Sequence, residues 1–172
     1  FTDNAFIGSR SMSMAGAVVS HTTDVESAFY NPAGLANLDE YSMMMGVTSL
    51  YGVKFLKHQF LSVGLPKKIA ISFQQLGTST KGSFGNNGSY DYNLSTEKSI
   101  SLSQGFSLLK DANSSLSVGY SLNGLIFYQN ISAGPSGDGT NGLSSSESTV
   151  IGVDFGILAS LRNKISFGAF IK

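Results

Sequence analysis

"SSLSVGYSLNGLIFYQN", residues 114–130, alternates apolar and small side chains over most of its length. One parity carries Leu116, Val118, Tyr120 and Leu122, and the other carries Ser117, Gly119 and Ser121. A period of two is the strand period, because successive side chains of a strand point to opposite faces. The stretch has 17 residues, whereas strands of globular proteins usually have about 5–6. It therefore predicts one long strand with an apolar face and a small, uncharged face.

The same period continues from residue 41 to the end of the chain and predicts about seven strands in an all-β, antiparallel arrangement. Short, charged turns are expected at 66–68, 110–114 and 162–164. Longer polar loops are expected at 78–89 and 133–148, with a shorter one near 52–58. Because short and long connections alternate, all short turns should lie at one end. This asymmetry is typical of outer-membrane β-barrels.

Composition excludes several classes of function. The chain has 172 residues, with 11 Lys plus Arg against 11 Asp plus Glu, so no basic excess favours a nucleic-acid partner. No run approaches the roughly 20 apolar residues of a membrane helix. Cysteine is absent, which removes disulfide scaffolds, thiolate zinc sites and thiol nucleophiles. The chain length suits one domain with a sizeable core.

Two architectures fit the strands. A soluble β-sandwich that binds a ligand also alternates, with one face buried, but it favours shorter strands and a charged outer face. Here the non-apolar parity carries Ser, Gly and Asn, and aromatic residues such as Tyr41, Tyr51 and Tyr128 gather toward strand ends. Small neutral residues suit a lumen, and aromatic girdles are typical of membrane barrels. The pattern favours the barrel and leaves the sandwich as the alternative.

Residues 1–40 lack the strand period. "TTDVESAF" carries a helix-start pattern in which Thr23 or Asp24 can cap the helix. Asn31 then precedes Pro32, and Asn at an N-cap followed by Pro in the first turn predicts a break and a new short helix. Gly34 permits close backbone approach or an unusual dihedral angle. The alternative interpretation is an ordinary turn that joins two helices.

"GSRSMSMAGAVVSHTTDVESAFYNPAGLANL", residues 8–38, resembles the N-terminal segment of the FadL/TodX family of outer-membrane transport barrels and their PorV-like relatives. The ordered set consists of a Ser-Arg stretch, small residues around Gly16, an acidic residue and the Asn-Pro-Ala-Gly motif. Beyond residue 40 the resemblance is one of pattern. The chain departs from many relatives at 14–17, where Met-Ala-Gly-Ala replaces a glycine-richer stretch.

The resemblance implies a fold and a function. Residues 1–40 would form a partly helical hatch in the lumen, with Asn31, Pro32, Ala33 and Gly34 as its motif and Gly16 among its close-packing points. Residues 41–172 would form part of a transmembrane β-barrel wall in the outer membrane, in contact with membrane lipids. The function would be passive uptake of hydrophobic small molecules of the long-chain fatty acid or hydrocarbon type. The alternative is a PorV-like anchor or shuttle protein of a secretion or surface assembly.

The resemblance also implies a barrel of about fourteen strands, twice the number expected here, and bacterial single-chain barrels have even strand numbers. We therefore expect this chain to be an N-terminal portion, with the remaining strands supplied by the same polypeptide or by another chain. "ISFGAFIK", residues 165–172, stops within its pattern at Lys172.

No residues assemble into a catalytic set, so we expect neither an enzyme nor a cofactor. His21 and His58 lack the spacing of a metal pair, and each is interpreted as a solvated or hydrogen-bonded residue. Met43 and Met45, together with Phe29, are the candidate contacts for a hydrophobic ligand, because methionine is flexible and polarizable. The alternative for the methionines is gap-filling packing and lipid contact.

Overall fold

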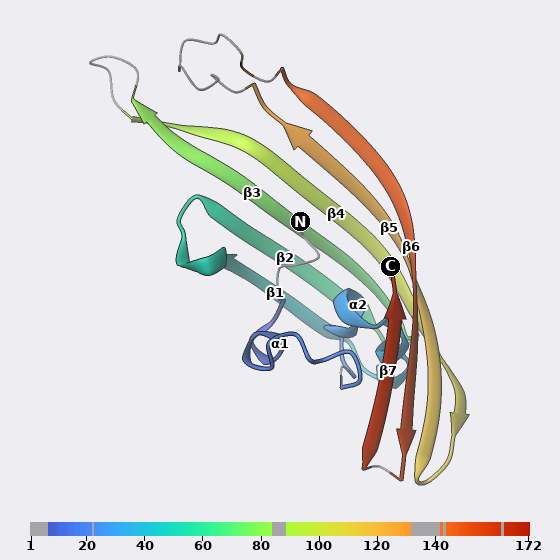
Figure 1. The fold of residues 1–172 in the computed structure, drawn as a ribbon. Coiled ribbons are helices and arrows are strands. Elements are labelled where there is room, and N and C mark those ends of the chain that lie inside the picture. Colours follow the sequence, from blue (N-terminus) through green and yellow to red (C-terminus); the bar gives the residue numbers. More distant parts are fainter. Residues whose placement is uncertain (1–6, 22, 84–88, 132–141, 143, 163) are drawn as a thin grey trace.

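The computed structural model describes residues 7–21, 23–83, 89–131, 142, 144–162 and 164–172. Its main feature is a single antiparallel sheet of seven strands, in which each strand pairs with its neighbour in the sequence. The strands are β1 (Ser42–Ser49), β2 (Leu56–Leu65), β3 (Ile69–Ser83), β4 (Ser89–Lys110), β5 (Ser114–Gln129), β6 (Ser146–Leu161) and β7 (Ile165–Ile171). The sheet curves into a half-barrel (Figure 1). The predicted all-β, antiparallel architecture is confirmed.

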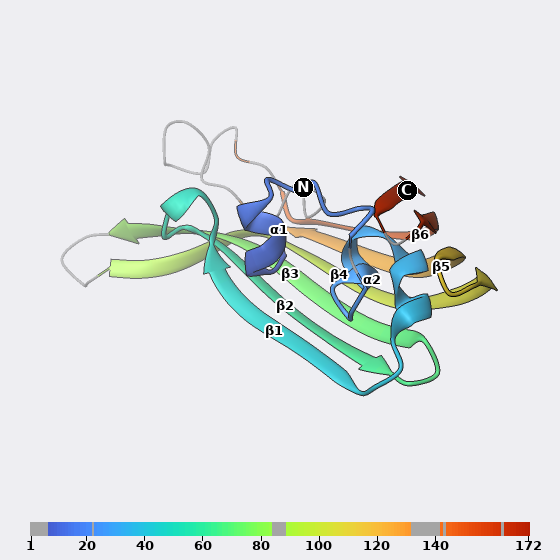
Figure 2. The same cartoon turned by 90° about the horizontal axis from the view of Figure 1, so that it is seen from below.

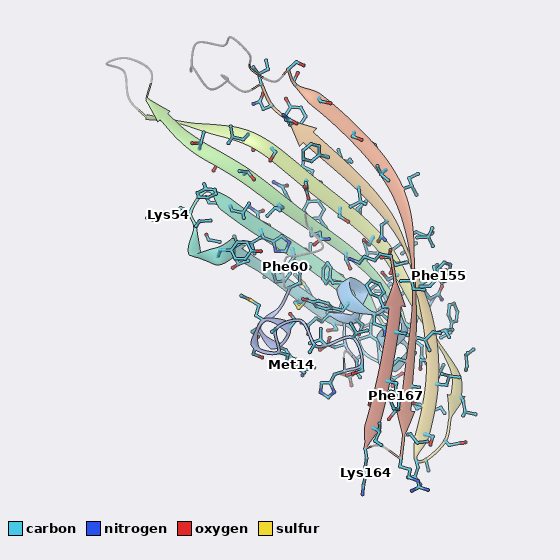
Figure 3. All side chains as sticks on the ribbon, in the orientation of Figure 1. Met14, Lys54, Phe60, Phe155, Lys164 and Phe167 are labelled. Atoms are coloured by element: carbon cyan, nitrogen blue, oxygen red, sulfur yellow. The ribbon has the colours of Figure 1, made fainter. Side chains whose placement is uncertain are left out.

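Alternation along each strand gives the sheet two chemically different faces. Val118 and Phe155 lie on the convex face, and Gly119 and Gly156, one position further along each strand, lie on the concave face against the N-terminal residues. In Figure 3, Phe155 lies on the convex side of the sheet and Phe60 on the concave side, close to the N-terminal helices. The apolar parity of the sequence thus covers the face that points away from the N-terminal segment.

The connections follow the predicted asymmetry where the structure describes them. The turns after β2, β4 and β6 are short, and positive φ angles at Lys68 (63°) and Arg162 (52°) close two of them. At the other end, β1 and β2 are joined through a one-turn 3-10 helix, η3 (Leu50–Gly52). The loop expected at 78–89 is shorter than predicted, because β3 and β4 continue to pair as far as Ser83 and Ser89. Most of the loop expected at 133–148 lies outside the described residues.

Residues 7–40 form a compact N-terminal segment on the concave face of the sheet (Figure 2). The segment contains α1 (Ser9–Ser13), α2 (Ser27–Tyr30) and the 3-10 helix η2 (Pro32–Asn37). The hydrophobic core sits between this segment and the wall and consists of Val25, Ala28, Leu35, Leu38 and Ala70. In the described parts of the chain, no helix has the length and apolar character needed to cross a membrane.

The sheet has two edges, β1 and β7. Every neighbouring pair is antiparallel, so the two edge strands run in the same direction. Among the described residues, β1 and β7 do not pair with each other, and the seven strands remain an open half-barrel.

Candidate functional site

Asn31 attaches the N-terminal segment to the concave face of the sheet through hydrogen bonds. Its side chain is fully buried, and its Nδ2 donates hydrogen bonds to the carbonyl oxygens of Val19 (2.9 Å) and Ile157 (3.0 Å). Its Oδ1 accepts a hydrogen bond from the amide of Ala33 (3.1 Å), which caps the start of η2 as the Asn-Pro pattern predicts. One amide group therefore joins two parts of the N-terminal segment to strand β6.

A row of three glycines in the wall receives this motif. Gly105, Gly119 and Gly156 stand directly opposite one another on β4, β5 and β6. A Cβ atom at Gly105 would lie 2.8 Å from the carbonyl carbon of Leu35, and one at Gly119 would overlap the backbone of Pro32 and Ala33. At Gly156 a Cβ would overlap the side chain of Asn31 and stand 3.0 Å from Pro32 Cδ. Only glycine allows η2 to lie this close to the strands.

On the side of the glycine row that lies away from the short turns, the concave face is lined with small polar side chains. The Ser62 and Ser72 hydroxyls form a hydrogen bond of 2.9 Å, and those of Ser103 and Ser121 form one of 2.7 Å. Each bond joins residues directly opposite on neighbouring strands. Because these hydroxyls satisfy one another, this part of the concave face is polar without carrying charge.

A cavity of about 360 Å³ lies between the N-terminal segment and the polar part of the wall. Phe29 and Tyr30 of α2 lie on one side, and Ser101, Asn123 and Asp154 of β4, β5 and β6 lie on the other. Asn123 Nδ2 donates a hydrogen bond of 2.7 Å to Asp154 Oδ2. The cavity thus has one aromatic side, and on the other side these hydrogen-bonding groups lie among the apolar residues Leu125 and Phe170.

Glu26 is an acidic residue enclosed by the N-terminal segment. Its side chain is 4% exposed, and its Oε1 makes no hydrogen bond with any described residue. Burial raises the pKa of Glu26, and the nearby Asp24 carboxylate adds to this effect; the Ser11 hydroxyl and Arg10 oppose it. Gly8, at φ 89°, lies so close to Glu26 Oε1 that a Cβ at this position would overlap it. The carboxyl group is therefore held in a place that disfavours its charged form.

The structure separates the candidate ligand contacts. Phe29 lies beside the cavity and meets Phe60 edge-to-face, with ring centroids 6.3 Å apart. Met43 and Met45 are 61% and 71% exposed on the convex face, because the register of β1 with β2 turns their side chains outward. Met44, between them, points inward and packs against the core. Met43 and Met45 are thus not brought together with Phe29.

The interpretation of His58 is wrong. The side chain is fully buried on the concave face, and neither ring nitrogen makes a hydrogen bond with a described residue. The register of β2 is the cause, because it sets His58 opposite Leu76 on β3 and close to the ring of Phe60. His21 is exposed in a turn. Within the described ranges, no group of His, Asp and Glu side chains could hold a metal ion.

The glycine row and the Asn123–Asp154 pair are features that the sequence pattern did not single out. The sequence does contain a signal for the glycine row. Each of the three glycines lies on the face of its strand that carries small residues. Each is also the same number of residues away from the end of its strand that adjoins a short turn. Gly34, in contrast, does not adopt a positive φ angle; Gly16 does, at 83°. Gly34 lies buried within η2, where its amide donates to the carbonyl of Asn31.

Comparison with known proteins gives no match: no family model, no curated protein and no solved structure resembles the chain significantly.

Proposed function

We propose that the chain forms part of an outer-membrane β-barrel of the FadL/TodX type, in which the N-terminal segment is the hatch. The barrel would take up small hydrophobic molecules by passive diffusion past this hatch. The observation that carries the proposal is the seating of the Asn31-Pro32-Ala33 motif on the glycine row of a concave wall. A segment held inside a curved sheet by its own fitted surface has the geometry of a plug.

The two faces of the wall support the membrane part of the proposal. The convex face exposes large apolar side chains on every strand, including Val63, Ile71, Leu102 and Ile157. A soluble protein rarely exposes so continuous an apolar surface, whereas a transmembrane barrel turns one outward to lipid. The short turns gather at one end of the strands, as they do at the periplasmic end of such barrels.

Closure of the barrel needs further strands between β7 and β1. Because these two edges run in the same direction, an antiparallel closure requires an odd number of added strands, the first running opposite to β7. A second copy of the chain in the same orientation would place parallel strands side by side at both junctions. We therefore expect a different set of strands, from the same polypeptide or from another chain, to complete the barrel.

A second candidate function, a PorV-like anchor for partner proteins, is favoured by one observation. The last residue of β2 to pair with β3 is Leu56, opposite Thr78, but β3 continues to Ser83 beyond this point (Figure 1). The free edge of β3 could accept an extended segment of a partner by strand addition. A protein segment paired along this edge would favour the anchor over the uptake function.

Uptake can be measured with the complete barrel, purified and reconstituted into lipid vesicles with radiolabelled oleate outside. We expect saturable uptake, and we expect Gly156→Ala to alter it because the added methyl group displaces Asn31 and Pro32. Overpacking of this kind typically costs about 1–3 kcal/mol. Gly77→Ala is the matched control, since a Cβ there meets nothing within 4 Å. Uptake no faster than in barrel-free vesicles would contradict the proposal.

A further inference from the structure

The cavity between α2 and the wall has two unlike sides, and together they define a ligand. On the side of the N-terminal segment, the lining consists of Ile7, Val19, Ala28, Phe29 and Tyr30. Backbone groups of Ile7 already engage the Tyr30 hydroxyl: the Ile7 amide donates to it at 2.6 Å, and it donates to the Ile7 carbonyl at 3.1 Å. Tyr30 therefore offers its ring to the cavity, and this side is apolar and aromatic.

The wall side offers hydrogen bonds. Asn123 commits its Nδ2 to Asp154, so its carbonyl oxygen is the atom of that amide left to accept a bond from a ligand. Ser99 and Ser101 bring hydroxyl groups from the neighbouring strand. These groups converge from β4, β5 and β6, opposite the aromatic side.

The charge of the lining and the volume of the cavity restrict the class of ligand that the cavity can bind. Asp154 and Lys172 both line the cavity and carry opposite charges, and the Lys172 ammonium lies over the Phe170 ring at 5.5 Å from its centroid. The lining therefore has no net charge that would attract an ion. Its volume, about 360 Å³, is near the lower end of the range of about 300–1,000 Å³ for ligand pockets. A compact molecule fits better than a long extended chain.

We propose that this cavity binds a compact, neutral ring compound that carries a hydroxyl group. The ring packs against Phe29 and Tyr30, and the hydroxyl donates to the Asn123 carbonyl oxygen. This inference rests on the proposed uptake function and names a ligand class for this cavity, without restricting uptake by the barrel to that class. A hydrocarbon without the hydroxyl leaves the polar wall desolvated and unpaired, and such loss discriminates strongly between otherwise similar ligands. A carboxylate loses more hydration than a hydroxyl when it is buried, and the lining, in which Asp154 and Lys172 balance each other, has no net positive charge to offset that loss.

Three probes of one shape test the inference with the complete barrel in detergent: 4-methylphenol, toluene and 4-methylbenzoate. We expect 4-methylphenol to bind at least about tenfold more tightly than toluene, the scale of one hydrogen bond to a buried group, and 4-methylbenzoate to bind most weakly. Asn123→Leu should reduce the affinity for 4-methylphenol to that for toluene and leave the affinity for toluene unchanged. Gln75→Leu is the matched control, since the register of β3 places this amide on the convex face, opposite Lys98.

The outcomes separate the inference from the function on which it rests. Tightest binding of toluene or 4-methylbenzoate would overturn the substrate class and leave the uptake function standing. Equal effects of Asn123→Leu and Gln75→Leu would overturn the assignment of the binding group. If none of the three probes binds and oleate does not enter vesicles, the uptake function itself fails.

Discussion

Asn31 holds three parts of the chain together through one amide group. Its two donated hydrogen bonds end on backbone carbonyls of the N-terminal segment and of β6, and its oxygen caps η2. Each of these contacts is satisfied without water, because the side chain is fully buried. The residue type is therefore restricted: an amide can donate two hydrogen bonds and accept one at the same time, whereas a carboxylate donates none and a hydroxyl donates only one.

We expect Asn31→Asp to damage the attachment of η2 more than Asn31→Ala does. Alanine leaves the carbonyls of Val19 and Ile157 without a partner, at about 1–3 kcal/mol for each buried unpaired group. Aspartate fills the space but sets a charged oxygen against the same two carbonyls. Protection of the η2 amides in hydrogen exchange measures the difference. Protection in both variants as high as in the unchanged protein would show that the donated bonds are unimportant.

Glu26 should make the N-terminal segment sensitive to pH. Because its pKa is raised in the folded segment above the model value of 4.5, the folded form binds the proton more tightly than the released form. The segment is therefore most firmly packed below that value, and packing weakens as the pH rises toward the raised pKa. Glu26→Gln should flatten this dependence in protection factors of the α2 amides. Glu40→Gln, at an exposed position, should leave it unchanged.

Strand parity sorts the wall into a face that meets the N-terminal segment and a face that does not. A charged substitution tests which environment the convex face occupies. Phe155→Arg lies in the middle of β6 and should cost about 2–4 kcal/mol if that face meets the bilayer midplane. Gln75→Arg, at the polar border beside Lys98, should cost about 0–1 kcal/mol. Reversible folding into lipid vesicles measures both. Similar, small costs would argue against a membrane around the wall.

The strands and short turns could be predicted from the sequence because both are local. The period of two sets each face of a strand, and the charged turns set its ends. The break at Asn31-Pro32 was predicted for the same reason. Contacts between distant parts of the chain could not be predicted. Asn31 donates a hydrogen bond to the carbonyl of Ile157, 126 residues away, and no local sequence pattern indicates this contact. The outward direction of Met43 and Met45 depends on the register of β1 with β2, which three consecutive methionines do not reveal.

At the scale of the whole sheet, the two edge strands β1 and β7 each have one side without a neighbouring strand among the described residues. Backbone groups on the outer sides of β1 and β7 lack a neighbouring strand among the described residues, and unpaired backbone is costly in lipid, by several kcal/mol per group. In the isolated 172-residue chain, we expect the amides along these two edges to exchange rapidly and those of β3 to β5 to stay protected. If further strands complete a barrel, as proposed, both edges should gain protection. Protected edges in the isolated chain would mean that the two strands already have partners.

The glycine row also has a consequence for the order in which the molecule is built. Residues 31–37 leave the ribosome before β4, β5 and β6 do, yet their position requires these three strands side by side, and Gly156 belongs to the last of them. Contacts between residues so distant in the chain form slowly, because a large loop must close first. The N-terminal segment therefore reaches its final position only after these strands have paired. A segment that is made before these strands is thus the last to reach its final position.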